Sequence, residues 1–152
     1  MKKISPILLV FALVFALCAC GAEEEPVAGI ANPMRSVDDK EFKSFTGVDP
    51  TLPGGAENVA YFIIANELGE LQFRSGSADW SFRVKQSKEA EDISGVYFSS
   101  PSVINSGDAV ISVESDGSIG TVTWFKDGRS FALYMKGEVS DKALADMYEN
   151  IL

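Results

Sequence analysis

The sequence predicts an α+β fold, in which a curved antiparallel sheet of six or seven strands carries an N-terminal and a C-terminal helix packed on it. Two Asp-Gly pairs divide residues 109–136 into three short runs of strand length. Apolar residues at helical spacing follow residue 36 and residue 140, and no helix of crossover length lies between them. Because parallel strands in one sheet need such crossovers, we expect the strands to run antiparallel.

The first 19 residues have the layout of a lipoprotein signal peptide. Lys2 and Lys3 precede an apolar run that ends in Leu17-Cys18-Ala19-Cys20-Gly21, which resembles the lipobox of bacterial lipoproteins. On this interpretation Cys20 becomes the first residue of the exported chain and carries two or three acyl chains such as palmitate. Two chains hold a protein stably on a membrane where one does not. Ordinary signal cleavage after Ala22 and a retained anchor helix are the alternatives.

Removing 19 of the 152 residues leaves 133, which suits a single domain on a tether. Of the 13 basic residues two leave with the signal, so 11 stand against 22 acidic residues, a net charge of −11. This charge opposes nucleic acid and anionic lipid as partners. The exported chain has no His and no Cys beyond Cys20, which excludes disulfides, Cys/His zinc sites and His-based catalysis.

Residues 20–35 are small, acidic and proline-bearing, as in a flexible tether, and the domain is expected at 36–152. Ser36 is predicted to cap a first helix that Gly47 ends. A helix of about 10 residues does not stand alone. Phe42 and Phe45 must therefore pack on another element, for which the sheet is the expected partner.

Four strands are predicted before residue 99. A continuous apolar run reads as a central strand buried on both faces, and an unbroken apolar-polar alternation reads as a half-buried strand. Polar and charged stretches between the strands read as loops. The predicted strands are 59–65, a strand beginning at Leu71, 78–85 and 93–98, and the loops are 86–92 and 99–108.

The two Asp-Gly pairs set the register of residues 109–136. Asp-Gly favours a two-residue hairpin turn because both positions need positive φ, which Gly adopts freely and Asp tolerates. A turn at 127–128 pairs Trp124 with Phe131, and a turn at 116–117 pairs Ala109 with Trp124. Read independently, the turns place one apolar set on one face, and a slip of one residue would break this agreement. The set is Ala109, Ile111, Val113, Val122, Trp124, Phe131, Leu133 and Met135.

The chain ends in a second predicted helix. Ser140 is the expected N-cap, followed by Asp141 at the positive end of the helix dipole. Apolar residues then fall at i, i+3, i+4 and i+7, which is one stripe of a helix. The stripe, expected to lie across a sheet face, is Leu144, Met147, Tyr148 and Ile151.

Several strings resemble a family of bacterial extracytoplasmic lipoproteins and the ectodomains of some membrane-bound anti-sigma factors, which share a domain of unknown function. They are residues 92–97 (DISGVY), 122–124 (VTW), the 127–128 turn, the 131–134 strand and the final helix. The resemblance runs from about residue 32 to the end. It implies an extracytoplasmic domain that senses or binds something outside the membrane. The chain lacks the cytoplasmic sigma-binding part, so that role is not carried over.

Carboxylates are the acid/base groups left to this chain, and each has an ordinary structural explanation at a helix start, a loop or a turn. Two facing carboxylates would make a glycosidase, but no pair is marked as facing another. Asp116-Gly117-Ser118 is similar to part of a calcium loop, yet the alternating ligands and closing Glu are missing. We therefore predict no catalytic residue, no metal and no cofactor.

Aromatic residues provide the candidate binding site. Trp80, Phe82, Phe125 and Tyr134, together with Trp124, are predicted to line an apolar groove between sheet and helix, or else to fill the core. Tyr134 is the better groove candidate because the register puts it on the face opposite Trp124. Within the predicted strand 78–85, the alternation places Arg83 and Lys85 on a solvated face.

The sequence thus predicts a membrane-anchored, extracytoplasmic, non-enzymatic module that binds an unknown small molecule or protein. The alternatives are a structural or accessory envelope lipoprotein acting through protein contacts, and a two-carboxylate hydrolase. Its oligomeric state is not determined by any of these patterns.

Overall fold

The computed structural model describes residues 33–152, which belong to one compact unit. The predicted signal peptide, the lipidation site Cys20 and nearly all of the tether lie outside the described residues. Within residues 33–152, no helix combines the length and the apolar character that crossing a membrane requires.

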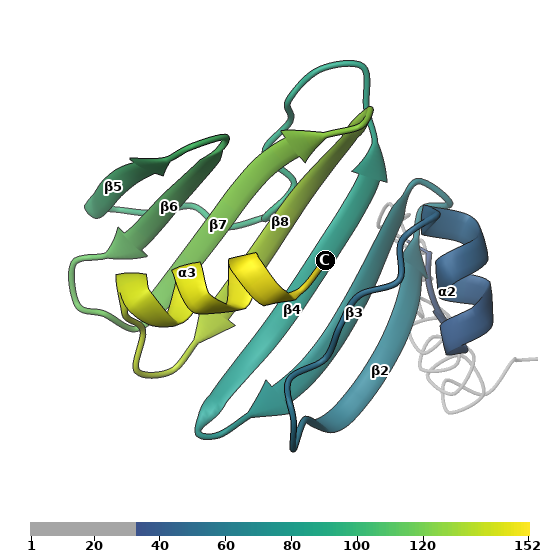
Figure 1. Ribbon diagram of the computed structural model, residues 1–152, viewed down its shortest axis with the longest axis horizontal. Helices are drawn as coiled ribbons and strands as arrows, with labels where there is room; N and C mark the ends of the chain where they lie inside the picture. The colour runs from purple at the N-terminus through teal and green to yellow at the C-terminus, as the bar shows by residue number, and fades with distance from the viewer. Residues whose placement is uncertain (1–32) are drawn as a thin grey trace, which may run out of the picture. The chain divides into compact units, whose positions relative to one another are not determined.

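The described residues form an antiparallel sheet of eight strands with two helices, which confirms the α+β class (Figure 1). The strand order is β1-β2-β3-β4-β8-β7-β6-β5. The first half comprises β1 (Met34–Val37), α2 (Asp39–Thr46), β2 (Glu57–Ile64), β3 (Leu68–Ser75) and β4 (Ala78–Gln86). The second half comprises β5 (Pro101–Ser106), β6 (Ala109–Glu114), β7 (Ile119–Lys126), β8 (Arg129–Lys136) and α3 (Asp141–Asn150).

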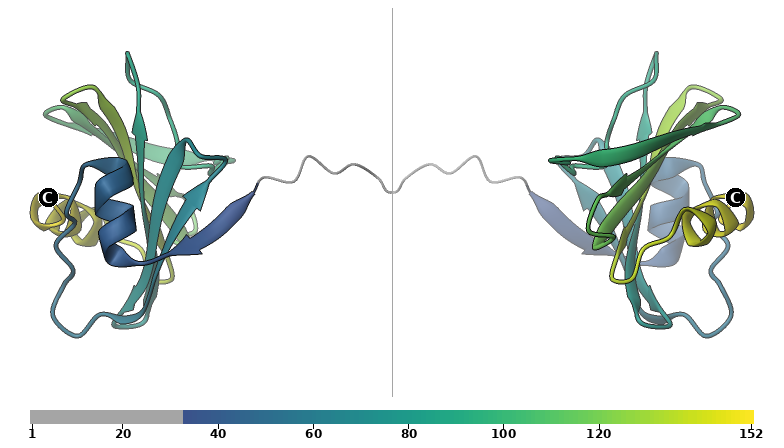
Figure 2. Two further views of the ribbon diagram at one scale, coloured as in Figure 1. Left: turned by 90° about the vertical axis from the view of Figure 1, so that its right-hand side faces the viewer. Right: turned by 90° about the vertical axis from the view of Figure 1, so that its left-hand side faces the viewer.

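Both helices pack on the same face of the twisted sheet (Figure 2). Helix α2 lies over β2, β3 and β4 and buries Phe42 completely, whereas α3 lies over β6, β7 and β8 and buries Leu144 completely. The core therefore forms between this helix-covered face and the two helices. The opposite face of the sheet carries no helix within residues 33–152.

The predicted register of residues 109–136 is confirmed. Trp124 pairs with Phe131 and Ala109 pairs with Trp124, and all eight residues of the predicted apolar set are buried. The 127–128 turn has two residues, both at positive φ (51° and 71°). The first turn is wider than predicted and occupies 115–118. The Asp116 carboxylate accepts hydrogen bonds from the backbone N–H and the hydroxyl of Ser118. The turn has one more residue on each side than predicted, so the register of the strands is unchanged.

The predicted strand count and the start of the first helix were wrong. Residues 34–37 form β1, paired with β2, so the helix is not the first element. Its N-cap is Asp38 rather than Ser36, and the Asp38 carboxylate accepts the backbone N–H of Glu41 at 2.8 Å. Ser36 instead lies in β1 opposite Phe62, because an extended segment beside β2 satisfies the backbone groups of that strand.

Three further strand predictions were wrong. β2 is second from the sheet edge and largely exposed at its start, not central and buried on both faces. Residues 93–98 form no strand, and side chains instead bond to the Ile93 and Ser94 carbonyls and to the Ser94 and Val96 N–H groups. The predicted loop 99–108 contains β5, a fully exposed strand at the edge of the sheet. Its composition resembles a loop because neither of its faces is buried.

The connection from β4 to β5 crosses the face without helices. Two strands that follow each other in sequence are separated here by β8, β7 and β6, so residues 87–100 must pass over those strands to reach the far edge (Figure 1). The Ser130 hydroxyl of β8 accepts the Glu91 N–H at 2.9 Å and donates to the Glu89 carbonyl at 3.3 Å. These bonds hold the start of the crossing segment on the sheet.

Candidate functional site

A row of polar side chains covers the middle of the helix-free face. Side chains alternate between the two faces along each strand. Because Leu71, Phe82 and Leu133 point into the core, their neighbours along the strands point the other way. These neighbours are Glu70 and Gln72 of β3, Ser81 and Arg83 of β4, and Ala132 and Tyr134 of β8.

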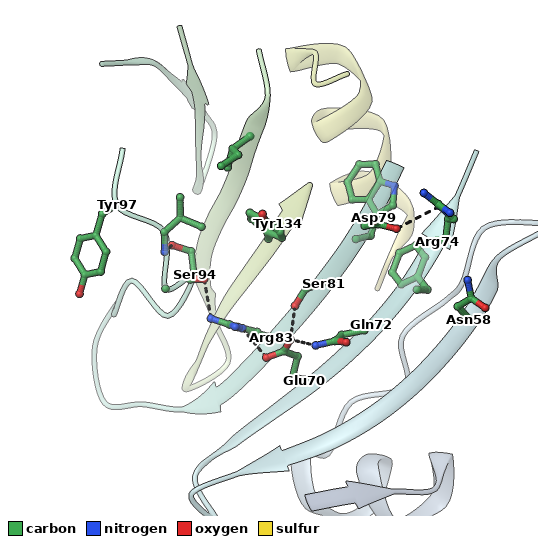
Figure 3. Close-up of a pocket in the computed structure, with 15 residues that line it drawn as sticks. Asn58, Glu70, Gln72, Arg74, Asp79, Ser81, Arg83, Ser94, Tyr97 and Tyr134 are labelled. Atoms are coloured by element: carbon green, nitrogen blue, oxygen red, sulfur yellow. Dashed lines mark hydrogen bonds and ion pairs between the residues drawn. The ribbon is translucent and has the colours of Figure 1, made fainter. Parts of the chain in front are cut away.

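This polar row forms the floor of an open groove of about 710 Å³, with Asn58 at one end and Tyr97 at the other (Figure 3). Residues 94–97 of the crossing segment form one wall. The floor and walls draw on five strands and one loop. The polar and aromatic lining consists of Asn58, Glu70, Gln72, Phe73, Arg74, Asp79, Trp80, Ser81, Arg83, Ser94, Tyr97 and Tyr134.

Glu70 is the centre of the floor. It is only 3% exposed, and its carboxylate accepts hydrogen bonds from Gln72 Nε2 at 2.6 Å, Ser81 Oγ at 3.1 Å and Arg83 Nε at 2.9 Å. A buried carboxylate is tolerated only when it is paired and hydrogen-bonded. The three donors meet that requirement, so Glu70 fixes the positions of three neighbouring side chains.

Arg83 connects this floor to the wall. Its Nη1 donates to the Ser94 carbonyl at 2.7 Å and to the Ile93 carbonyl at 3.3 Å. Gly95 has φ of +68°, and a Cβ atom there would lie 2.6 Å from Arg83 Nη1. Glycine therefore serves both the left-handed turn and the close approach of the guanidinium. Through Arg83, the wall 94–97 is attached to the same network as the floor.

A second ion pair lies nearer the Asn58 end of the groove. Arg74 Nε is 3.3 Å from Asp79 Oδ1, and the two side chains are 48% and 64% exposed. The pair is placed by the cross-strand register of β3 and β4, in which these residues are direct partners. Exposed pairs of this kind contribute little to stability, so these side chains are available for contacts with a ligand.

Two tyrosines belong to the groove. Tyr134 is half-buried on the floor, and burial raises the pKa of its phenol above the ordinary value. A tyrosine phenol is protonated at neutral pH, and the raised pKa extends this to higher pH, so the hydroxyl can donate a hydrogen bond. Tyr97 is 99% exposed and stands at the end of the wall (Figure 3).

The structure does not bring the four predicted groove residues together. Trp80 and Phe82 lie in the core on the helix-covered face, at 5% and 0% exposure. The Phe82 ring packs against Phe131 and Trp124 at centroid distances of 6.1 and 6.2 Å. Phe125 and Tyr134 belong to the opposite face, as their partners Ser130 and Ser81 show. Of the four, Tyr134 and an edge of the largely buried Trp80 are among the residues that line the polar groove, and Phe82 and Phe125 are not.

A separate apolar groove of about 530 Å³ lies where the sequence placed its candidate, between α3 and the sheet. Trp80 lines it together with Leu52, Pro53, Ala143 and Met147. Phe82, Phe125 and Tyr134 do not reach it. This groove is therefore a gap beside the core rather than the aromatic site that the sequence predicted.

Sequence reasoning missed Glu70 and placed Arg83 on a solvated face. Glu70 reads as an ordinary polar residue between Gly69 and Leu71. The signal was nevertheless present, since the two-residue turn after Ser75 pairs Glu70 directly with Arg83. Opposite charges at directly paired positions indicate an ion pair. Their burial, by contrast, depends on the wall that residues 93–97 build over them.

The carboxylates predicted at helix starts and turns are found there, with Asp38 capping α2 and Asp116 in the 115–118 turn. Within residues 33–152, no three acidic, Cys or His side chains are arranged to hold a metal ion. Comparison of the chain with protein-family models, curated proteins and solved structures finds no match.

Proposed function

We propose that this protein is a lipid-anchored, extracytoplasmic module of a bacterial cell envelope that binds a polar ligand in the groove and does not transform it. The observation that carries the proposal is the network that joins floor and wall, in which Glu70 holds Arg83 and Arg83 holds the Ser94 carbonyl. The anchor rests on the lipobox of residues 17–21, and the extracytoplasmic setting rests on the resemblance to envelope lipoproteins.

Preorganisation supports binding as the role of this groove. A site whose side chains are already locked by hydrogen bonds loses less entropy when a ligand arrives. Glu70 accepts three bonds and is nearly inaccessible, so it acts as a support for the floor. Arg74, Asp79 and Tyr134 are more accessible and are the groups that contact the ligand.

The pairing of the carboxylates supports binding rather than hydrolysis. A two-carboxylate glycosidase needs one protonated acid and one free carboxylate that face each other across the substrate. In this groove Glu70 is held by Arg83 and Asp79 by Arg74. Both acids are thus engaged with guanidinium groups in an arrangement suited to recognition.

Native mass spectrometry of the full chain purified from its own cells tests the proposal. We expect a bound mass on the wild-type protein that is absent from Arg74→Ala, because Arg74 lies at the groove and is half-exposed. The control is Ile104→Ala, an exposed apolar residue outside the groove, which should keep the bound mass. A wild-type protein without any bound mass would contradict the proposal.

The anchor has its own test. Cys20→Ala should abolish the incorporation of labelled palmitate and move the protein from the membrane fraction to the soluble extracytoplasmic fraction. Cys18→Ala is the matched control and should leave both unchanged. Labelling that persists in Cys20→Ala would contradict lipidation at this residue.

An accessory role through protein contacts is the second candidate, favoured by the β5 edge. Strand β5 pairs with β6 on one side, and all six of its residues are exposed and uncharged. Val103 and Ile104 are 56% and 41% exposed. Such an edge accepts an added strand from an extended peptide. A photocrosslinker at Ile104 that captures a defined protein in intact cells, while one at Lys142 on α3 does not, would favour this role.

A further inference from the structure

The charges that line the groove cancel in pairs. Arg74 is bound to Asp79 and Arg83 to Glu70, at 3.3 and 2.9 Å, and these four are the charged residues of the lining. An anionic ligand would meet two carboxylates as well as two guanidinium groups, and a cationic ligand would meet the reverse. A charged ligand therefore gains little net electrostatic attraction from this surface. The groove favours an uncharged ligand.

Hydrogen-bonding groups remain available along the groove. Among residues 33–152, no hydrogen bond occupies the terminal nitrogens of Arg74, the side-chain amide of Asn58 or the Tyr134 hydroxyl. The Gln72 amide donates to Glu70, which leaves its oxygen as an acceptor. The groove thus presents donors and acceptors in mixed order. Hydroxyl groups, which donate and accept at once, can use both kinds.

Tyr97 and Tyr134 add aromatic faces to this polar surface. The Tyr97 ring is 99% exposed at the end of the wall, although burying an aromatic ring is favourable. A tyrosine ring has an apolar face and a polar tip, which matches a sugar ring with its C–H face and its rim of hydroxyls. Tyr134 supplies a second ring on the floor, where burial raises the pKa of its phenol and keeps it protonated.

The length of the groove indicates an extended ligand. Its lining runs across β2, β3, β4, β8 and β7, from Asn58 towards Ile119 and Tyr97. Four strand spacings of about 4.8 Å make a span of roughly 19 Å, longer than one sugar ring. The groove is open to solvent rather than enclosed, so a longer chain is free to leave it at both ends.

We infer that the groove binds a segment of a neutral oligosaccharide, with Tyr97 stacking on one sugar ring and Arg74, Gln72 and Tyr134 bonding to hydroxyls. The inference rests on the proposed binding function and names its ligand class. Asp79 holds Arg74 in place, and Glu70 and Arg83 hold the floor and wall. The glycan backbone of a cell wall or an envelope polysaccharide has the required chemistry.

Calorimetric titration of the full chain, purified in a detergent without sugar head groups, tests this assignment. The probes are neutral hexamers of glucose and of N-acetylglucosamine, the corresponding disaccharides, and an anionic hyaluronan hexamer. We expect at least one neutral hexamer to bind about tenfold or more tightly than its disaccharide and than the hyaluronan hexamer. Tyr97→Ala should weaken this binding about tenfold or more, and Ile104→Ala should leave it unchanged.

Tyr97 is almost fully exposed, so its replacement leaves the fold intact, which circular dichroism checks. Absence of neutral-hexamer binding up to about 10 mM, tighter hyaluronan binding, or an unchanged affinity in Tyr97→Ala would overturn the assignment. If native mass spectrometry then finds a bound mass other than a sugar that Arg74→Ala abolishes, the binding function stands and the ligand class is wrong. If no bound mass is found either, both fail.

Discussion

Replacing Glu70 with alanine should destabilise the domain strongly, because three donors lose their acceptor in one step. Removing one partner of a buried ion pair costs about 3–5 kcal/mol. The side chain of Glu70 is 4% exposed, whereas that of Arg83 is 26% exposed and keeps its bond to the Ser94 carbonyl. Water and that carbonyl therefore compensate part of the loss. We expect the free energy of unfolding to fall by about 2–4 kcal/mol.

Urea denaturation followed by tryptophan fluorescence measures this effect. Trp80 and Trp124 are each 5% exposed, so unfolding changes the environment of both. The matched control is Asp79→Ala, which removes the same type of ion pair from a site where its side chain is 64% exposed. That variant should lose less than about 1 kcal/mol. The double variant Glu70→Leu with Arg83→Met should recover part of the stability lost in Glu70→Ala, because no buried charge is left unpaired.

A loss in Glu70→Ala no larger than in Asp79→Ala would refute the reasoning. It would mean that water reaches Glu70 and Arg83 freely, and that the pair does not organise the groove. If the double variant is less stable than Glu70→Ala, the hydrogen bonds of Arg83 stabilise the domain by more than is regained when its unpaired charge is removed.

Three further predictions concern other parts of the fold. Gly120→Ala should lower the free energy of unfolding, measured with heat or urea, by about 1–3 kcal/mol, because a Cβ atom would lie 2.7 Å from Leu144 Cδ1 of α3. An unchanged stability would show that α3 shifts freely. Ser140→Ala should cost about 0.5–2 kcal/mol, since the Ser140 hydroxyl caps α3, and Ser140→Asp should retain most of the stability. The pKa of Glu114 should lie below the ordinary glutamate value, because the backbone N–H of Ser99, followed by those of neighbouring serines, donates to it. The ionised Glu114 carboxylate stabilises the folded state above the ordinary glutamate pKa, and this stabilisation is lost as the pH falls through the lowered pKa. An NMR titration of the Ser99 amide should therefore show a midpoint below the pKa of a free glutamate.

The parts of the fold predicted correctly depended on local signals. The pairing of Trp124 with Phe131 follows from a turn of two residues, and the faces follow from strict alternation between them. The α3 stripe and its Ser140 cap likewise require only neighbouring residues. By contrast, β5 was taken for a loop because an edge strand exposed on both faces lacks the apolar alternation by which strands are recognised.

The candidate site was predicted less well, for a related reason. Aromatic residues were chosen by type, yet Trp80 and Phe82 occupy the core face and Tyr134 the opposite one. Their separation has two causes. One is the alternation of side chains between the two faces along each strand, which the sequence shows. The other is the direct pairing of β4 with β8, which joins segments about fifty residues apart in sequence and which the sequence does not show.

By itself, the sequence determined the class of the fold, the register of its last three strands and the division of their side chains between two faces, because these depend on backbone geometry over a few residues. Only the tertiary structure decided that β8 lies beside β4, that residues 87–100 cross the open face, and that Arg83 joins Glu70 to the wall of a groove. Contacts of that kind are made between distant segments, and their partners are selected by the packing of the whole domain.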